Sequence, residues 1–168
     1  PPSIWRRWFH IAAGSSIPIL GVFLSDDLMV GVLAVLCGLA ITIEAARFAY
    51  PPLNLALTEI FRPLLKKGEV QRVTAATYML LAGLVCFLLF DRHLAVAALL
   101  FLSVGDPVAA LVGSRVGGPR FWHKSPWGGL ALFASTAALS LTLWATGVSS
   151  PLWPLLAGGI VAAAVEML

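Results

Sequence analysis

Charged residues are scarce in this chain. Asp, Glu, Lys and Arg make up 11% of its 168 residues, residues with apolar side chains make up 60%, and the mean hydropathy is +0.93. Soluble globular domains carry about 25% charged residues, so this composition excludes an ordinary soluble domain. It predicts an integral membrane protein, with the lipid bilayer as its surroundings.

Cysteine is also scarce, and the two that are present, Cys37 and Cys86, both fall within long apolar runs. Neither a disulfide framework nor a spacing suited to a metal site is visible. The basic residues form no run with the length and interleaved aromatic residues that nucleic-acid binding needs. We therefore expect both cysteines to be packing residues, and we expect no nucleic-acid partner.

Long apolar runs dominate the sequence. A transmembrane helix needs about 20 mostly apolar residues, because backbone polar groups in lipid must bond within their own segment. Six segments qualify: Trp8–Leu24, Leu28–Phe48, Val73–Phe90, Leu94–Val112, Gly128–Thr146 and Pro151–Leu168. The expected fold class is therefore all-α, a single polytopic membrane domain over residues 1–168 with about six transmembrane helices.

The basic residues are distributed unevenly over the loops that these spans imply. Ten of the 11 Lys and Arg residues fall on one side of the membrane and only Arg92 on the other. Positively charged loops stay in the cytoplasm, so both termini and the two long loops are expected there. One of these loops, Pro51–Arg72, carries leucines and polar residues at helical spacing. It predicts an amphipathic helix in the membrane interface, bent or ended near Pro63.

Gly105, Asp106 and Pro107 interrupt the fourth apolar run. An ionised Asp at mid-membrane depth costs on the order of 3 kcal/mol to insert, which makes Asp106 a candidate functional residue. Asp at the N-cap followed by Pro is also an ordinary helix start. Both interpretations predict a broken fourth helix. A break at this depth lines a cavity and offers free N–H groups to an anion.

Two further polar groups lie near the expected cytoplasmic ends of spans. Lys124 and Ser125, followed by Gly128, can hold phosphate oxygens by a point charge and backbone donors, although the spacing is not that of a Walker-type loop. Glu44 and Arg47 lie three residues apart on one helix face, where an ion pair lowers the burial cost of both. That pair either joins helices or serves the site.

Arg7 and His10 begin the first span, and Glu69 precedes the third. His10 is either a phosphate or head-group contact or a residue at the membrane interface. One acid can hold Mg²⁺, and several bases with glycine backbone can hold a polyphosphate. The sequence thus has the groups that phosphoryl transfer requires.

Five stretches, taken in order, resemble a known family. They are Arg6-Arg7-Trp8-Phe9-His10 with Gly14; Glu44-Ala45-Ala46-Arg47; Glu69 with Thr74-Ala75-Ala76-Thr77-Tyr78; Gly105-Asp106-Pro107-Val108-Ala109-Ala110 with Gly113 and Gly117; and Lys124-Ser125 with Gly128. The chain resembles the membrane-bound lipid kinases that include dolichol kinase, phytol kinase and the CTP-dependent diacylglycerol kinase. That family is related to the phosphatidate cytidylyltransferases. Trp127 departs from the pattern, which has Glu in its place, and relatives continue beyond the last residue into an acidic stretch and another hydrophobic segment.

The resemblance implies Mg²⁺-dependent transfer of the γ-phosphate of CTP, or of another nucleoside triphosphate, to the hydroxyl of an isoprenoid alcohol or diacylglycerol. Asp106 would bind the metal, Lys124 and Ser125 would contact the phosphates, and Gly113 and Gly117 would let the nucleotide approach the backbone. The remaining residues that the resemblance assigns to the site are Arg7, His10, Glu44, Arg47, Glu69, Gly105 and Gly128. The active site would face the cytoplasm.

Two other functions are compatible with the same residues. One is a CTP-dependent cytidylyltransferase acting on phosphatidate or a prenyl phosphate. The other is a small membrane transporter or scaffold without catalysis, whose broken fourth helix lines a path. The apolar lining is generic, so the acceptor lipid, CTP against ATP, and monomer against homodimer stay open.

Overall fold

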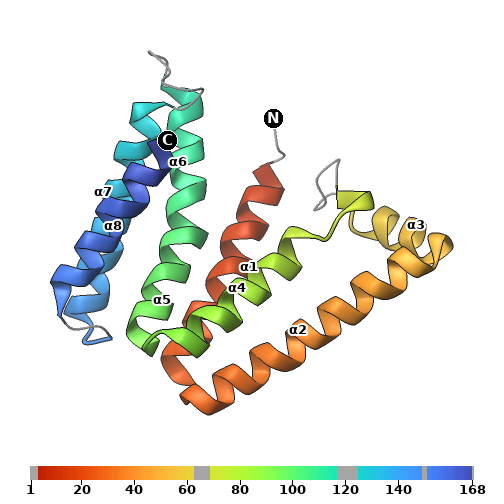
Figure 1. The fold of residues 1–168 in the computed structure, drawn as a ribbon. Coiled ribbons are helices and arrows are strands. Elements are labelled where there is room, and N and C mark those ends of the chain that lie inside the picture. Colours follow the sequence, from red (N-terminus) through yellow and green to blue (C-terminus); the bar gives the residue numbers. More distant parts are fainter. Residues whose placement is uncertain (1–3, 63–68, 117–124, 149–150, 168) are drawn as a thin grey trace. The chain divides into compact units, whose positions relative to one another are not determined.

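The computed structural model describes residues 4–62, 69–116, 125–148 and 151–167, with the side chains of residues 4–10 and 69 excepted. Helices form almost all of this part of the chain, and it contains no strand (Figure 1). The α-helices are α1 (Ile4–Phe23), α2 (Asp26–Ala49), α3 (Pro51–Ile60), α4 (Ala75–Leu89), α5 (Arg92–Leu100), α6 (Asp106–Arg115), α7 (Pro126–Ala145) and α8 (Leu152–Met167). A 3₁₀ turn, η1 (Glu69–Gln71), precedes α4, and a π-helical turn, η2 (Phe101–Gly105), joins α5 to α6. The expected all-α class is confirmed.

Each of the six expected spans overlaps a helix. Within the described residues, three helices are long and apolar enough to cross a membrane: α2, the continuous helix Arg92–Arg115 that contains α5, η2 and α6, and α7. The apolar helices α4, α8 and the Ile11–Phe23 part of α1 are shorter. The structure is therefore compatible with a membrane protein, and the count of six spans stays a prediction.

The helices form two compact units. The first comprises Pro1–Phe9 and Leu24–Phe90, and within it α2 packs against α4 and α3. The second comprises His10–Phe23 and Asp91–Leu168, and within it α7 packs against both α6 and α8. The proposed site residues are divided between them, since Glu44 and Arg47 belong to the first unit and Asp106 to the second.

Local sequence explains where α2 and α3 begin and end. Asp26 and Asp27 occupy the first turn of α2 and Arg47 its last, as the helix dipole favours. Two prolines begin α3 directly after Tyr50, where a missing N–H costs nothing. The amphipathic helix expected in this loop is present, and it ends at Ile60, shortly before Pro63.

Small residues bring the backbones of the second unit close together. A Cβ added at Gly128 of α7 would lie 3.2 Å from the Ala109 carbonyl oxygen of α6. A Cβ added at Gly159 of α8 would lie 2.7 Å from the Thr136 hydroxyl oxygen of α7. Small residues at helix contacts are typical of proteins in lipid, where packing replaces the hydrophobic driving force between helices.

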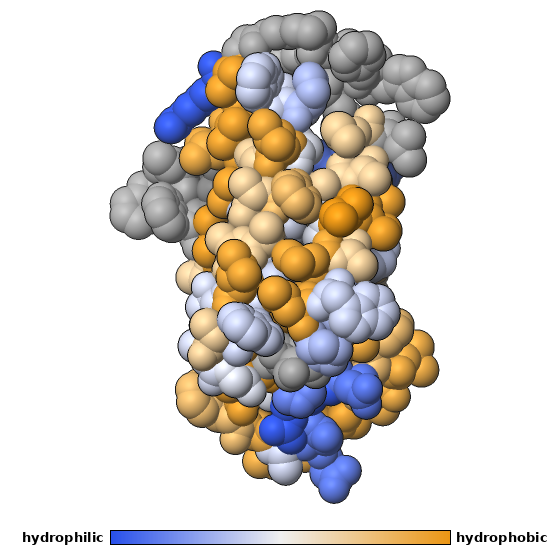
Figure 2. Space-filling view, turned by 90° about the vertical axis from the view of Figure 1, so that its left-hand side faces the viewer, coloured by the Kyte–Doolittle hydropathy of each residue, from blue (hydrophilic) through white to orange (hydrophobic). Residues whose placement is uncertain are grey.

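Apolar side chains cover much of the outside of the second unit. Ile160, Val161 and Val165 of α8 are each more than half exposed, and Figure 2 shows the apolar residues (orange) that dominate this face. Trp127 and Trp144 are exposed near the two ends of α7, and a separation of 17 positions along the helix spans about 26 Å. This matches the hydrocarbon thickness of about 30 Å and an aromatic residue at each interface.

Candidate functional site

The expected break in the fourth span is absent, and that prediction is wrong. Gly105 (φ −63°, ψ −49°) and Asp106 (φ −61°, ψ −48°) both have helical backbones, so the chain continues through them as one helix. Pro107 has no N–H, and its ring clashes with the carbonyl four residues earlier, at Ser103, in a regular α-helix. The π-helical turn η2 widens the helix at this point and accommodates the proline. Asp106 therefore does not begin a half-helix with free N–H groups.

The π-helical turn packs inward and leaves Asp106 outside. Ser103 is buried, and its hydroxyl lies 3.1 Å from that of Ser15 in α1. A Cβ added at Gly105 would lie 2.6 Å from Leu132 Cδ1 of α7, so helix packing accounts for this glycine. Asp106, one residue later, is exposed. Asp106 is the first residue of α6, and it lies on the surface of the second unit.

Three other predicted site residues, Gly113, Ser125 and Gly128, lie together about two helical turns beyond Asp106. A Cβ added at Gly113 would lie 3.4 Å from both Gly128 Cα and Ser125 Cβ, where α6 ends and α7 begins. Gly113 itself lies within α6, near its end. Asp106 lies seven residues before Gly113, which places the two on one face of α6 about 10 Å apart along the axis. Lys124 and Gly117 lie outside the described residues.

Ser125 directly precedes α7 and has an extended backbone (φ −96°, ψ 128°). Its carbonyl oxygen accepts hydrogen bonds from the N–H groups of Gly128 and Gly129, at 2.9 and 3.4 Å. Its hydroxyl makes no capping bond to the helix. The hydroxyl is therefore available for another acceptor or donor at the beginning of α7. Trp127 is 45% exposed beside it, where the resemblance expects an acid.

A resident metal site built by the protein alone is not found in the part of the chain that the structure describes. No group of three or more His, Cys, Asp or Glu side chains lies close enough there to hold an ion. Mg²⁺ in phosphoryl-transfer enzymes needs less, since one or two carboxylates suffice when phosphate oxygens and water complete its shell. An exposed Asp106 fits this second mode.

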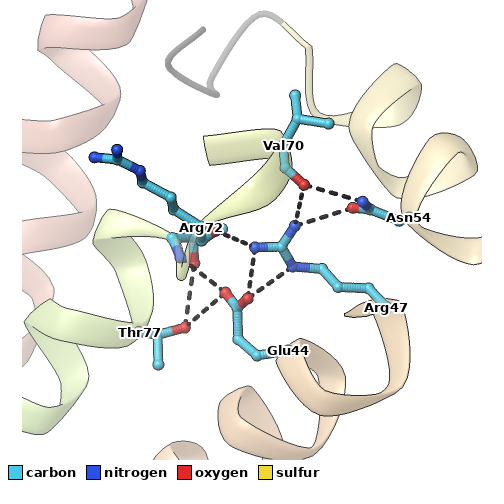
Figure 3. A network of polar contacts seen from close by, with 7 residues as sticks. Glu44, Arg47, Asn54, Val70, Arg72 and Thr77 are labelled. Atoms are coloured by element: carbon cyan, nitrogen blue, oxygen red, sulfur yellow. Dashed lines mark hydrogen bonds and ion pairs between the residues drawn. The ribbon is translucent and has the colours of Figure 1, made fainter. Parts of the chain in front are cut away.

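The first unit contains a network of buried polar groups around Arg47 (Figure 3). Arg47 and Glu44 are 5% and 7% exposed, and their closest atoms, Nη2 and Oε2, are 2.6 Å apart. Glu44 Oε1 accepts hydrogen bonds from the Thr74 N–H (2.9 Å) and the Thr77 hydroxyl (3.2 Å). The Asn54 amide nitrogen donates to the Val70 carbonyl at 2.9 Å. We call this network, which joins α2, α3, η1 and the beginning of α4, the Arg47 clamp.

Every N–H of the Arg47 guanidinium is used within the Arg47 clamp. A guanidinium has five donors. Nε donates to Glu44 Oε2 at 2.7 Å, and Nη1 donates to Asn54 Oδ1 at 3.0 Å and to the Val70 carbonyl at 3.2 Å. Nη2 donates to the Arg72 carbonyl and bonds Glu44 Oε2. Arg47 consequently has no donor left for a phosphate oxygen in this arrangement.

The sequence indicated the Glu44–Arg47 pair but not what surrounds it. Asn54 was recognisable only as part of the polar face of α3, and the carbonyls of Val70 and Arg72 carry no signal in side-chain chemistry. Three other predicted site residues have undescribed side chains. Arg7 and His10 lie in α1 and Glu69 lies in η1, and their contacts fall outside the described part.

An uncharacterized protein of Rickettsia prowazekii (strain Madrid E) is similar to this chain. The two are 23% identical over 142 residues, which cover 83% of this chain and 69% of the other. No family model matches the chain, and no solved structure matches it.

Proposed function

We propose that this protein is a membrane-embedded lipid kinase. It transfers the γ-phosphate of CTP, or of another nucleoside triphosphate, to the hydroxyl of an isoprenoid alcohol or of diacylglycerol. The observation that carries the proposal is the exposed carboxylate of Asp106, on a helix apolar enough to cross a membrane. Acidic side chains are rare in such helices, and one within them is a candidate functional residue by default.

The surroundings of Asp106 support the same reaction. Gly113 lies on the same face of α6 as Asp106 and lets the beginning of α7 come close. Ser125 lies there, and its hydroxyl makes no capping hydrogen bond to α7. Lys124 precedes Ser125 in the sequence and supplies a positive charge for phosphate. Mg²⁺ on Asp106 would neutralise charge on the transferring phosphate, and positioning together with charge neutralisation is most of what this chemistry needs.

The membrane supplies the second substrate. The exposed apolar sides of α7 and α8 are suited to contact with acyl or isoprenoid chains, so a lipid alcohol reaches the protein within the bilayer. We place the site on the cytoplasmic side, in a six-span topology, because the positively charged loops and nucleoside triphosphates are both expected there.

Phosphate transfer from labelled nucleotide tests the proposal. Purified protein in vesicles is given γ-labelled CTP, ATP, GTP or UTP with a panel of lipid alcohols and Mg²⁺. Label in the lipid supports a kinase, and label in pyrophosphate indicates the cytidylyltransferase. If no label is transferred to any acceptor, a transporter or scaffold without catalysis is the remaining function.

Asp106→Asn should abolish Mg²⁺-dependent transfer while leaving the fold intact, because it removes the negative charge and keeps the size of the side chain. Asp27→Asn is the matched control, since Asp27 is also exposed in the first turn of a helix that can cross the membrane. Transfer that is unchanged in Asp106→Asn, or reduced equally in both variants, would refute the role of Asp106.

A further inference from the structure

The Arg47 clamp fixes the main chain on both sides of Arg72. The carbonyls of Val70 and Arg72 accept from the Arg47 guanidinium, and the N–H of Thr74 donates to Glu44. Three main-chain groups within five consecutive residues are thus bonded to one buried ion pair. A segment between two helices is seldom held this firmly, because loops in general are mobile surface elements.

The side chain of Arg72 takes no part in the bonds that hold its main chain. Arg72 is exposed, and its guanidinium points away from Glu44 and Arg47 (Figure 3). No ion pair with a carboxylate is found for it among the side chains that the structure describes. The chain therefore presents a charged, planar group from a rigid base. Such a guanidinium matches the oxygens of a phosphate through two parallel hydrogen bonds.

Arg72 lies at the end of the first unit where exposed tyrosines gather. Tyr50 directly follows α2 and is 68% exposed, and Tyr78, in the first turn of α4, is 62% exposed. Tyrosine at the end of an apolar helix is typical of the level of the lipid head groups. The position of Arg72, just before α4, puts it at that level, where phosphate is abundant on lipids and accessible from water.

We propose that Arg72 is a phosphate-binding residue and that the Arg47 clamp positions it. The ligand is a phosphate group, carried either by an anionic lipid head group or by a soluble polyphosphate. Glu44 and Arg47 act on this phosphate only through the main chain that they hold, as positioning residues. The proposal concerns binding and does not rest on the kinase reaction.

Binding to two probes separates the two sources of phosphate. The full chain is reconstituted in nanodiscs of phosphatidylcholine, with and without phosphatidic acid, and the retention of fluorescent phosphatidic acid is measured. In the other arm, inorganic tripolyphosphate is titrated onto protein in phosphatidylcholine alone. Wild-type binding in either arm identifies the source, and binding in neither arm overturns the proposal.

Substitutions then test Arg72 itself. Arg72→Gln should weaken phosphate binding about tenfold or more, as for a lost charge-assisted hydrogen bond. Arg72→Lys should have an affinity between those of Arg72→Gln and wild type, because it keeps the positive charge and loses the two parallel donors of the guanidinium. Arg62→Gln is the matched control, since Arg62 is an exposed arginine of the same unit and loses the same charge. If Arg72→Gln and Arg62→Gln lost the same phosphate affinity, the effect would come from surface charge in general, and the proposal would be overturned.

The positioning role is tested by coupling. Asn54→Ala weakens the Arg47 clamp without changing its charge, and it should reduce phosphate affinity in the wild-type chain but not in the Arg72→Gln background. Additive effects would overturn the positioning part. Both binding assays are run without Mg²⁺ and without nucleotide, so an absence of phosphate transfer in the kinase assay and an absence of phosphate binding in these assays are separate results.

Discussion

The first unit joins α2, α3 and α4 through one buried Glu44–Arg47 ion pair, whereas the second joins α6, α7 and α8 through glycines and small side chains. In the first unit Arg47 and Glu44 bond to groups 7 to 33 residues away in the sequence. In the second, buried hydroxyls mostly bond within their own helix, as Thr136 and Ser140 do with carbonyls of α7. Close contact between backbones therefore holds the helices of the second unit together, whereas hydrogen bonds between segments hold those of the first.

The difference follows from where the backbone is irregular. In the first unit residues 69–74, directly before α4, contain only the short 3₁₀ turn η1, and their carbonyls need partners that no α-helix supplies. A buried carbonyl without a hydrogen bond is costly, so the five donors of a buried arginine offset the cost of burying its charge. The second unit runs as long helices that satisfy their own backbones, and small residues suffice.

Removal of the arginine gives the largest expected effect. Arg47→Met keeps an apolar stem of similar length, but it leaves Glu44 buried without its cation and the Arg72 carbonyl without its arginine donor, and the Val70 carbonyl keeps only Asn54. Breaking a buried pair from one side costs about 3–5 kcal/mol. We expect a loss of this size in the free energy of unfolding, measured by denaturant titration in detergent.

The control for Arg47→Met removes both charges. Glu44→Leu combined with Arg47→Met should cost less than Arg47→Met alone, because no isolated charge remains buried. If Arg47→Met lowered the free energy of unfolding by less than about 1 kcal/mol, the first unit would not depend on its clamp and the contrast between the units would fail.

A single methyl group tests the second unit. A Cβ at Gly159 would lie 2.7 Å from the Thr136 hydroxyl oxygen and 3.2 Å from Thr136 Cβ, so Gly159→Ala forces α8 away from α7. Overpacking of this kind costs about 1–3 kcal/mol. Gly158→Ala is the neighbouring control, since its Cβ would meet only Phe101 Cε2, at 3.8 Å, and alanine favours a helix. Equal stability of the two variants in the same denaturant titration would contradict close packing at Gly159.

Apolar runs predicted the helices well, because the length of a run and the position of its ends are local properties. The run Leu28–Phe48 lies within α2, Asp26–Ala49, and the Pro-Pro pair indicated correctly where α3 begins, at Pro51. The break at Asp106 could not be predicted correctly. Gly-Asp-Pro carries the same local preference whether the chain starts a new helix or widens into a π-helical turn, and packing of Gly105 against α7 decides between them.

The candidate site was predictable only in part for a similar reason. The spacing of Glu44 and Arg47 predicted their ion pair, but the carbonyls of Val70 and Arg72 become available only because the chain there forms no α-helix, only the short 3₁₀ turn η1 and the residues after it. A glycine such as Gly113 serves equally well for a nucleotide or for a helix that approaches closely. Its contact with Gly128 identifies at least the second use.

Two hydroxyls give the smallest and most direct test of the contrast. The Thr77 hydroxyl, on a 4% exposed residue, donates to Glu44 of another helix, whereas the Thr136 hydroxyl donates at 3.0 Å to the Phe133 carbonyl of its own helix. Thr77→Val should therefore cost about 1 kcal/mol of the free energy of unfolding, as for one net hydrogen bond. Thr136→Val should cost less, because the Phe133 carbonyl lies within α7 and keeps its backbone partner. Equal losses would mean that hydroxyls stabilise both units in the same way, and the distinction between a bonded unit and a packed one would disappear.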